Sequence, residues 1–297
     1  MWFEELTGFR EESPAQVRAN LEQNGNSLKS RVNGKTFVHG RLETPSLAEL
    51  RSAVPASQIT TGRFRIGEIV ADAQTLHADP ANAGAVFQVA SQFNLLEMTS
   101  QDITPELGVD RYENDHTQGP ACAVAAGAGT IYRNYLAKVN GRTGQSSDNQ
   151  IDCLWDVGHT LGNMDGQLWR MQNGYAMASQ SGLTEISARI KGMSRQERDA
   201  LRKKLRIGIQ WDTQVTIRGC RHLVTQVYGS ALPVAYMNHT NGLWREFALL
   251  VLEASYEATL WAALLNYART GNNKVYLTLL GGGVFGNEED WILSAID

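Results

Sequence analysis

The chain has 297 residues, of which 42% are hydrophobic and 20% are charged, a composition typical of a soluble globular protein with a substantial core. Its formal net charge of −4 provides no basic field along the whole chain, which argues against nucleic acid or an anionic membrane surface as the principal partner. Cys122, Cys153 and Cys220 are far apart and lack Cys-x-x-Cys spacing, so we expect neither a disulfide framework nor a zinc site, and a cytoplasmic location.

The first 61 residues are predicted to form an extension of helix, hairpin and helix. The N-terminal sequence has no basic region followed by an apolar stretch, so we expect no signal peptide. A Ser followed three residues later by Glu or Gln, the spacing of a capping box, predicts helix starts at Ser13, at Ser46 and, further on, at Ser194. Between the first two helices, Asn33-Gly34 predicts a two-residue hairpin turn.

From residue 62 onward, strands and helices are expected to alternate, which predicts an α/β protein. The expected elements are a strand and turn in 62–77, a strand in 85–98, a helix in 119–136 opened by Pro120, a strand-like stretch in 222–237, a long helix near 243–269 and a strand in 274–280. Ligands of such sheets bind at the carboxyl ends of the strands.

Two segments inside this pattern need separate interpretation. The most apolar one, 247–268, carries Glu253 and Glu257 in its middle, so we expect a buried helix and not a membrane span. Residues 139–220 are predicted to be an insertion, and eight basic residues stand against two acidic ones between Ile186 and Gly208. A solvated helix face explains such a charge run; the alternative is a patch at 189–206 that contacts the phosphates of a nucleotide or a macromolecular substrate.

Three consecutive glycines end the last predicted strand, in the sequence LLGGGVFGNEEDW. A tight connection needs only one glycine, so the triplet favours a loop in which bare backbone approaches a phosphate. The sequence has neither the Gly-Lys-Ser/Thr of a Walker A motif nor the spacing GxGxxG. It resembles the phosphate-binding loop of macrodomains, which bind ADP-ribose or hydrolyse ADP-ribosyl bonds. The resemblance implies a loop that binds substrate through Gly281, Gly282, Gly283, Val284, Phe285, Gly286 and Asn287.

Upstream segments resemble macrodomains in the same order. In RIGEIVADA, Glu68 stands in place of the acid that binds the adenine amino group, followed by Ile69, and VFQVASQFNLLEM resembles the strand that ends in Asn94 near the distal ribose. The first glycine loop and its helix would begin at Thr117, Gln118, Gly119 and Pro120. The similarity covers about 62–136 and 221–296. It implies a three-layer mixed sheet flanked by helices in a domain from 62 to 297, interrupted at about 139–220, with residues 1–61 as an N-terminal extension.

This sequence also departs from the family pattern. Members usually carry Asn-Ala-Ala-Asn and then a glycine run, whereas this chain has Gln88 to Asn94 followed by LLEM. It lacks the neighbouring glutamates of poly(ADP-ribose) glycohydrolases, although YENDHTQGP brings Glu113 and Asp115 to the corresponding loop. Macrodomains usually continue into one more strand, so we expect either that the N-terminal hairpin supplies it or that the sequence is shortened at its C-terminus.

For several side chains, the sequence allows both a functional role and a structural one. Glu113 and Asp115 either position a water for attack on an anomeric carbon or only solvate the loop and cap the helix. Gln88, Gln92 and Asn94 face one side of a strand only if no turn follows Ala90, and buried amides need partners. Phe285 belongs either to the core or to a ribose site. His116 has no second histidine at ligand spacing, so we expect no metal and no other cofactor.

Two functions follow from the resemblance. The first is an enzyme that hydrolyses an ADP-ribosyl bond, with Glu113, Asp115 and Asn94 as catalytic candidates and the two glycine loops holding the pyrophosphate. The second is a module that binds ADP-ribose or a related nucleotide without turnover. The acidic loop favours the enzyme and the lost Asn and Gly pattern favours the binding module; we expect the enzyme.

Overall fold

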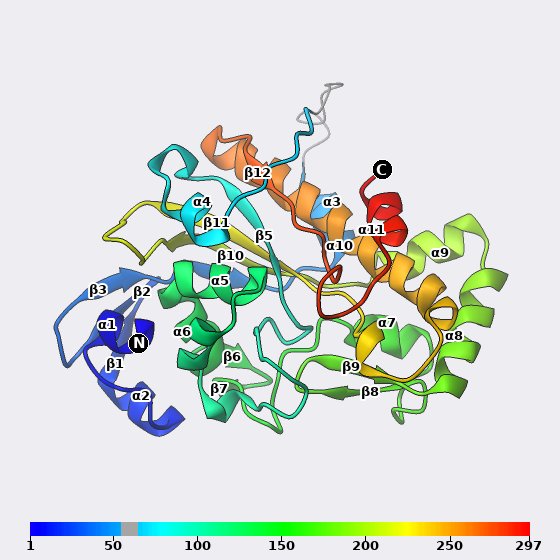
Figure 1. Cartoon of the computed structure of the whole chain (residues 1–297), viewed down its shortest axis with the longest axis horizontal. Coiled ribbons are helices and arrows are strands. Elements are labelled where there is room, and N and C mark those ends of the chain that lie inside the picture. The colour runs from blue at the N-terminus through cyan, green and yellow to red at the C-terminus, as the bar shows by residue number, and fades with distance from the viewer. Residues whose placement is uncertain (55–64) are drawn as a thin grey trace.

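The computed structural model describes residues 1–54 and 65–297 and shows a mixed α/β protein built on a five-stranded mixed sheet (Figure 1). The strand order is β12 (Val275–Tyr276), β5 (Val86–Ala90), β11 (Leu223–Gly229), β10 (Gly208–Gln214) and β4 (Arg41–Glu43). β12, β5 and β11 are parallel, whereas β10 runs antiparallel to both β11 and β4. Three neighbouring strands therefore end at the same edge of the sheet.

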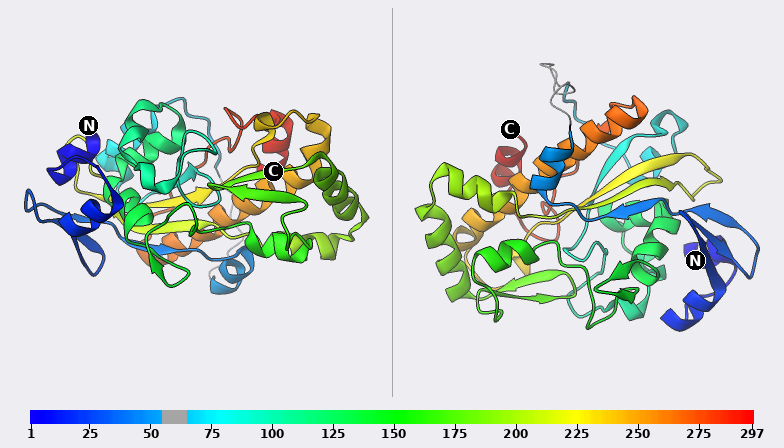
Figure 2. Two further views of the ribbon diagram at one scale, coloured as in Figure 1. Left: turned by 90° about the horizontal axis from the view of Figure 1, so that it is seen from below. Right: turned by 180° about the vertical axis from the view of Figure 1, so that it is seen from behind.

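Helices cover both faces of this sheet (Figures 1 and 2). One face packs against α10 (Asn241–Thr270), to which the buried Gln88 side chain of β5 donates a hydrogen bond at Thr259. The other face packs against α4 (Ala73–Ala78), α5 (Gln118–Ala125) and α6 (Gly127–Tyr135). There Gln226 of β11 donates to the Cys122 carbonyl of α5. Buried amides on both faces thus have the partners that buried polar groups require.

The other elements surround this centre. The N-terminal part contains α1 (Trp2–Thr7), α2 (Pro14–Asn20), a small sheet of β1 (Leu21–Asn24), β2 (Ser27–Ser30) and β3 (Thr36–Val38), and α3 (Leu47–Ala53). Short 3-10 helices are η2 (Pro80–Asn82), η3 (Pro105–Leu107), η4 (Asp110–Asn114) and η5 (Val234–Tyr236). The remaining elements are β6 (Lys138–Val139), β7 (Arg142–Thr143), α7 (Trp155–Thr160), β8 (Trp169–Gln172), β9 (Tyr175–Ala178), α8 (Gln180–Gly192), α9 (Arg195–Arg202) and α11 (Glu289–Ile296).

The predicted helix starts are confirmed, two of them as complete capping boxes. Ser46 and Ser194 exchange hydrogen bonds with the residue three positions on, whereas Ser13 accepts from the Gln16 backbone but the Gln16 side chain turns to Glu12 instead. The predicted two-residue turn at Asn33-Gly34 is wrong. β2 and β3 pair only from Lys29 and Thr36 outward, because the Asn33 side chain donates to the Leu6 carbonyl and holds a wider loop against α1.

The predicted strands are shorter than their apolar stretches. Residues 65–72 form no strand and are exposed, while 62–64 lie outside the described residues. The strand expected at 85–98 ends at Ala90, so a turn does follow it and the expected alternation of Gln88, Gln92 and Asn94 is lost. The helix expected at 119–136 is broken at Ala126, because Thr216 bonds to the backbone of both Ala125 and Gly127.

The central sheet and the principal core cluster include parts of the expected extension and insertion. β4 comes from 1–61 and β10 from 139–220, the segments expected to be an extension and an insertion. The principal core cluster likewise contains Leu50 of α3, Leu183 of α8 and Trp244 of α10. Boundaries at 61, 139 and 220 therefore do not separate these segments from the central sheet and its core.

The long helix α10 lies mainly inside the protein. By length and composition alone it could cross a membrane, but 67% of its apolar window is buried. Its two acids contact the basic segment: Glu253 pairs with Arg198 and Arg202, and Glu257 pairs with Arg202 and Arg51. Much of the charge of the basic segment is thus neutralised within the fold.

Candidate functional site

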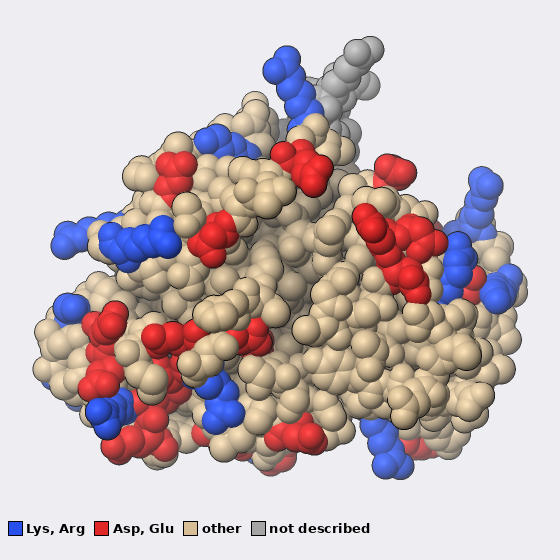
Figure 3. All heavy atoms as spheres, viewed as in Figure 1, with Lys and Arg blue, Asp and Glu red and all other residues tan. Residues whose placement is uncertain are grey.

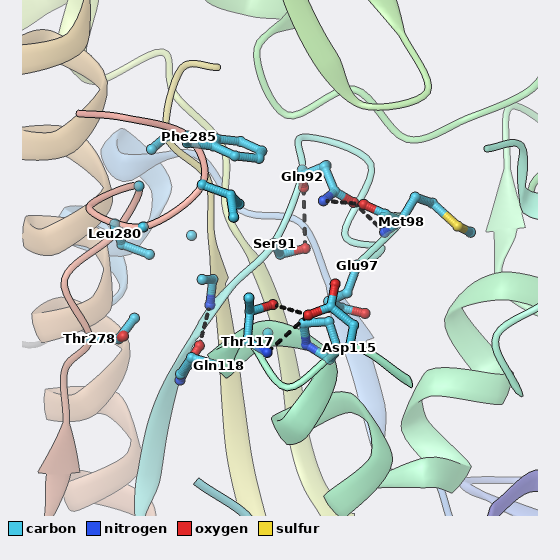
Figure 4. Close-up of a pocket in the computed structure, with 18 of the residues that line it drawn as sticks. Ser91, Gln92, Glu97, Met98, Asp115, Thr117, Gln118, Thr278, Leu280 and Phe285 are labelled. Carbon is cyan, nitrogen blue, oxygen red and sulfur yellow. Dashed lines mark hydrogen bonds between the residues drawn. The ribbon is translucent and has the colours of Figure 1, made fainter. Parts of the chain in front are cut away.

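A cavity of about 220 Å³ lies where β5, β11 and β12 end, on a face that is hollowed near its centre (Figure 3). Its wall contains Ala90, Ser91, Gln92, Glu97, Met98, Thr99, Asp115, Thr117, Gln118, Gly119, Pro120, Tyr175, Gly229, Ala231, Tyr236, Thr278, Leu279, Leu280, Gly281, Gly283, Val284 and Phe285 (Figure 4). The carboxyl ends of parallel strands are where α/β sheets bind ligands. None of the lining residues is Lys or Arg.

The glycine loop after β12 forms one side of this cavity. Gly281 and Gly286 have positive φ angles of 73° and 69°, whereas Gly283 does not and faces open space. The base of the loop is closed by two hydrogen bonds, from Asn287 N to Gly281 O at 2.9 Å and from the Asn287 side chain to Leu232 O at 2.8 Å. Asn287 therefore shapes the loop from behind and does not line the cavity.

The backbone N–H groups at the tip of this loop are free. Gly282 and Gly286 donate to carbonyls of the loop itself, but among the described residues Gly283, Val284 and Phe285 donate to no protein group. Successive unpaired N–H groups form a concave site suited to an anion. The structure thus corrects the expectation for Gly282 and Gly286, whose N–H groups are already used.

The start of α5 forms the opposite wall. Gly119 is pressed against the end of β5, where an added Cβ would lie 2.0 Å from the Ala90 carbonyl oxygen. Gln118 is clamped to the same strand, because its side chain accepts from Ala90 N and donates to Gln88 O, each at 2.8 Å. The N–H groups of Gln118 and Gly119 donate to no group in the described part of the chain, as is usual at a helix start, and such N–H groups favour negative charge.

Of the three predicted catalytic residues, the structure brings Asp115 alone to the cavity. Its Oδ1 accepts hydrogen bonds from Thr117 N at 2.9 Å and Thr117 Oγ1 at 2.7 Å, and no described protein group donates to Oδ2. Glu113 instead accepts from Trp2 N and pairs with the N-terminus. Asn94 is fully buried and bonds to Gln150 and to Leu96 N. Glu113 and Asn94 are thus bonded to other parts of the fold and do not line the cavity.

The other predicted ligand-binding residues divide in the same way. Gln92 lines the cavity and bonds to both backbone groups of Met98, which fixes the loop after β5. Gln88 faces α10 and accepts from Thr278 N, so it lies behind the wall. Glu68 and Ile69 are exposed and do not line the cavity, so the adenine contact of Glu68 stays a prediction. Gly282 is also absent from the lining.

Sequence reasoning missed Glu97. This glutamate lies in the loop after β5, is 1% exposed and still contributes to the cavity wall beside Asp115 (Figure 4). Burial raises the pKa of Glu97 to about 7, although the nearby Arg133 guanidinium opposes this shift. The signal in the sequence was an acid inside the apolar run NLLEM, where a charged group is costly unless it has a partner or a task.

Sequence reasoning also missed two members of an aromatic cluster. Tyr175 of β9, Tyr236 of η5 and Phe285 of the glycine loop line the cavity, with ring centroids 5.2 to 5.5 Å apart. The Tyr175 hydroxyl donates to Met98 O at 2.6 Å, which ties β9 to the loop after β5. Because these three rings come from distant parts of the chain, no local pattern indicates that they meet. Aromatic side chains of this kind can pack against a planar ligand group.

Comparisons with known protein families, with curated proteins and with solved structures found no match. The described residues contain no group of three or more His, Cys, Asp or Glu side chains placed to hold a metal ion. The wall of this cavity combines two carboxyl groups, free backbone N–H groups and an aromatic cluster.

Proposed function

We propose that this protein hydrolyses an ADP-ribosyl bond in a macrodomain-like α/β fold. The observation that carries the proposal is one cavity whose wall contains both Asp115 and the residues Gly283, Val284 and Phe285, whose N–H groups donate to no described protein group. The N–H groups suit a phosphate, and the carboxylate suits the activation of water. The resemblance of both loops to those of macrodomains supports the same substrate class.

A pyrophosphate is the ligand group that best matches the two loops. The free N–H groups of the glycine loop and those of Gln118 and Gly119 flank one cavity. With no Lys or Arg in the wall, a bound pyrophosphate would be stabilised by backbone dipoles and by the start of α5. Phe285 carries one of these N–H groups and also an aromatic ring that lines the cavity, and a ribose attached to the pyrophosphate would contact this ring.

Asp115 is the residue that would activate water in this reaction. Thr117 orients one of its oxygens, which leaves the other to accept a proton from a bound water. The water oxygen would attack the anomeric carbon of the ribose while the bond from that carbon to the acceptor breaks. General base catalysis of this kind typically contributes about 10²- to 10⁴-fold to the rate.

A non-catalytic nucleotide-binding module is the second candidate. It is favoured by the position of Asn94, the expected ribose-site residue, which is buried, donates to Gln150 and does not line the cavity. Both candidates require nucleotide binding, and only the first requires Asp115 for turnover. Binding and hydrolysis therefore have to be measured on the same preparation.

The test begins with calorimetric titration of ADP-ribose, ADP, AMP and NAD⁺, in which we expect ADP-ribose to bind most tightly. Mono-ADP-ribosylated protein, ADP-ribosylated nucleic acid and ADP-ribose 1''-phosphate are then assayed for release. Asp115→Asn should slow release by about 10²-fold or more, whereas Glu113→Gln, at an exposed acid outside the cavity, should not. Binding without release would favour the module, and no binding at millimolar concentration would refute both candidates.

A further inference from the structure

Glu97 carries a carboxyl group that is buried in the wall of the cavity, which is an expensive position for an acid. Its side chain is 1% exposed and lies on the same side of the cavity as Asp115, opposite Leu280 and Phe285 (Figure 4). Its backbone holds the loop, since Glu97 N donates to the Tyr112 hydroxyl at 3.1 Å. Its carboxyl group faces the buried Arg133 guanidinium on one side and belongs to the cavity wall on the other.

A strong ion pair does not explain it. The Arg133 guanidinium approaches Glu97 only to 3.3 and 3.4 Å, longer than the roughly 2.7 to 2.9 Å of a good charge-assisted hydrogen bond. Arg133 is held by other groups: it donates to Leu95 O at 2.9 Å and to the Tyr228 hydroxyl, and lies 4.0 Å over the Tyr228 ring. A carboxyl group in this setting keeps its proton more readily than one in a close bidentate pair.

The protonation of Glu97 depends on burial, which favours the neutral form, and on the surrounding groups. They are Arg133 on α6, Tyr112 on η4, Tyr228 on β11, Cys122 on α5, Asp115 ahead of α5 and the Ser91 hydroxyl after β5, which like Arg133 opposes the rise in the pKa of Glu97. Burial raises the pKa of Tyr112, Tyr228 and Cys122, so these three remain neutral at physiological pH. Arg133 is the cation that faces Glu97, and its contact is long.

We infer that Glu97 is a second catalytic carboxyl group, the general acid that protonates the leaving oxygen of the ADP-ribosyl bond; this inference rests on the proposed hydrolysis. The two carboxyl groups of the cavity lie in unequal environments: Glu97 is buried, whereas Asp115 is partly exposed and accepts two hydrogen bonds on one oxygen. Unequal environments of this kind separate the pKa values of a catalytic acid and a catalytic base. The burial that raises the pKa of Glu97 to about 7 supplies the protonated form near neutral pH.

The step balances without a further reactant. The water oxygen forms a bond to the anomeric carbon while the bond from that carbon to the acceptor oxygen breaks and its electron pair stays on that oxygen. Asp115 takes a proton from the water and Glu97 gives its proton to the leaving oxygen. The products are free ADP-ribose and the hydroxyl form of the acceptor, and a net transfer of one proton from Asp115 to Glu97 through solvent restores the site.

Two probes with different leaving groups separate an acid from a structural residue. In an ADP-ribosylated serine peptide, the leaving group is the serine oxygen, which would depart as an unstable alkoxide and therefore needs a proton. In ADP-ribose linked at C1'' to 4-nitrophenol, the leaving group is a stable phenolate that needs none. In wild type, we expect kcat on the serine peptide to fall as pH rises through about 7 and kcat on the nitrophenyl probe to persist. Glu97→Gln should lower the former about 10²- to 10⁴-fold and change the latter only a few-fold.

Glu113→Gln is the matched control, because it neutralises a glutamate outside the cavity and should change neither probe. Equal loss on both probes in Glu97→Gln, or a wild-type pH profile identical for both, would overturn the acid role while leaving hydrolysis intact. If Glu97→Gln does not fold, the two wild-type pH profiles decide alone. If wild type binds ADP-ribose but cleaves neither probe, the hydrolase proposal fails and this inference with it.

Discussion

Three residues of the glycine loop meet different physical demands. Gly281 and Gly286 adopt positive φ, and an added Cβ on Gly281 would lie 2.5 Å from both Ala231 Cβ and Asn287 Nδ2. Gly283 adopts no such angle and has open space where a side chain would go. Gly281 is therefore required by the turn, whereas Gly283 is free to vary unless a ligand occupies that space.

This difference predicts that Gly283→Val abolishes ADP-ribose binding while the protein stays folded. A side chain at Gly283 would occupy open space at the cavity wall, where we expect it to obstruct the approach of a phosphate without disturbing α11. Gly281→Ala, the contrasting variant, should lower the free energy of unfolding by at least about 1 to 2 kcal/mol, because it adds positive-φ strain to a steric clash. Thermal unfolding with and without ADP-ribose measures both effects. Normal stabilisation of Gly283→Val by ADP-ribose would show that no ligand approaches there.

The site residues show which positions a sequence can reveal. The glycine loop, Asp115 and the start of α5 were predicted, because each belongs to a short contiguous motif. Glu113, two residues from Asp115, could not be told apart from it by pattern, since only the fold turns one acid toward the cavity and the other toward the N-terminus. Tyr175 could not be predicted, because its role depends on where the β8–β9 hairpin packs.

At the scale of elements, the principal charge cluster links α9, α3 and α10. Arg198 donates two hydrogen bonds to Glu253, and Arg51 donates two to Glu257 at 2.6 and 2.7 Å. These carboxylates are about 20 to 26% exposed, so water screens them only partly. By contrast, Lys191, Arg195 and Lys204 are exposed and form no ion pair with a described residue.

We therefore predict that neutralising a charge of the cluster lowers the free energy of unfolding, whereas neutralising an exposed charge outside it does not. Glu253→Gln should lower the free energy of unfolding by about 1 to 3 kcal/mol, because it leaves Arg198 and Arg202 without their carboxylate. Lys204→Gln, the matched neutralisation at an exposed position, should change it by less than about 0.5 kcal/mol. Urea unfolding measures both. An unchanged midpoint for Glu253→Gln would mean that the pairs contribute no net stability.

Helices and strands could be predicted from the sequence only where local sequence signals agreed with the packing of the folded protein. The capping boxes at Ser46 and Ser194 and the long apolar segment at 247–268 were sufficient to predict those helices. The apolar residues Ile66, Ile69 and Val70 suggested a strand but are exposed in the structure, because no strand of the sheet pairs with them. The break at Ala126 depends on Thr216, which lies 90 residues further along the chain.

The central sheet brings together segments that the sequence suggested were separate. β4 reaches β10 through residues 41–43, β10 pairs with β11, and the parallel strands that end at the cavity follow. The helices α3 and α8 place Leu50 and Leu183, 3% and 0% exposed, in the same core cluster as α10. Since one core spans these segments, loosening any of them exposes apolar surface in the others.

The whole molecule is therefore predicted to unfold in one cooperative transition. Leu50→Ala and Leu183→Ala should each lower the free energy of unfolding by about 2 to 5 kcal/mol, because each leaves a cavity in the shared core. In differential scanning calorimetry, the whole peak should move to lower temperature in both variants, with equal calorimetric and van't Hoff enthalpies. Leu293→Ala, at a leucine of α11 that is 49% exposed, is the matched control and should leave the peak nearly in place. Two separate peaks, of which Leu183→Ala moved only one, would show instead that residues 139–220 fold as a unit of their own.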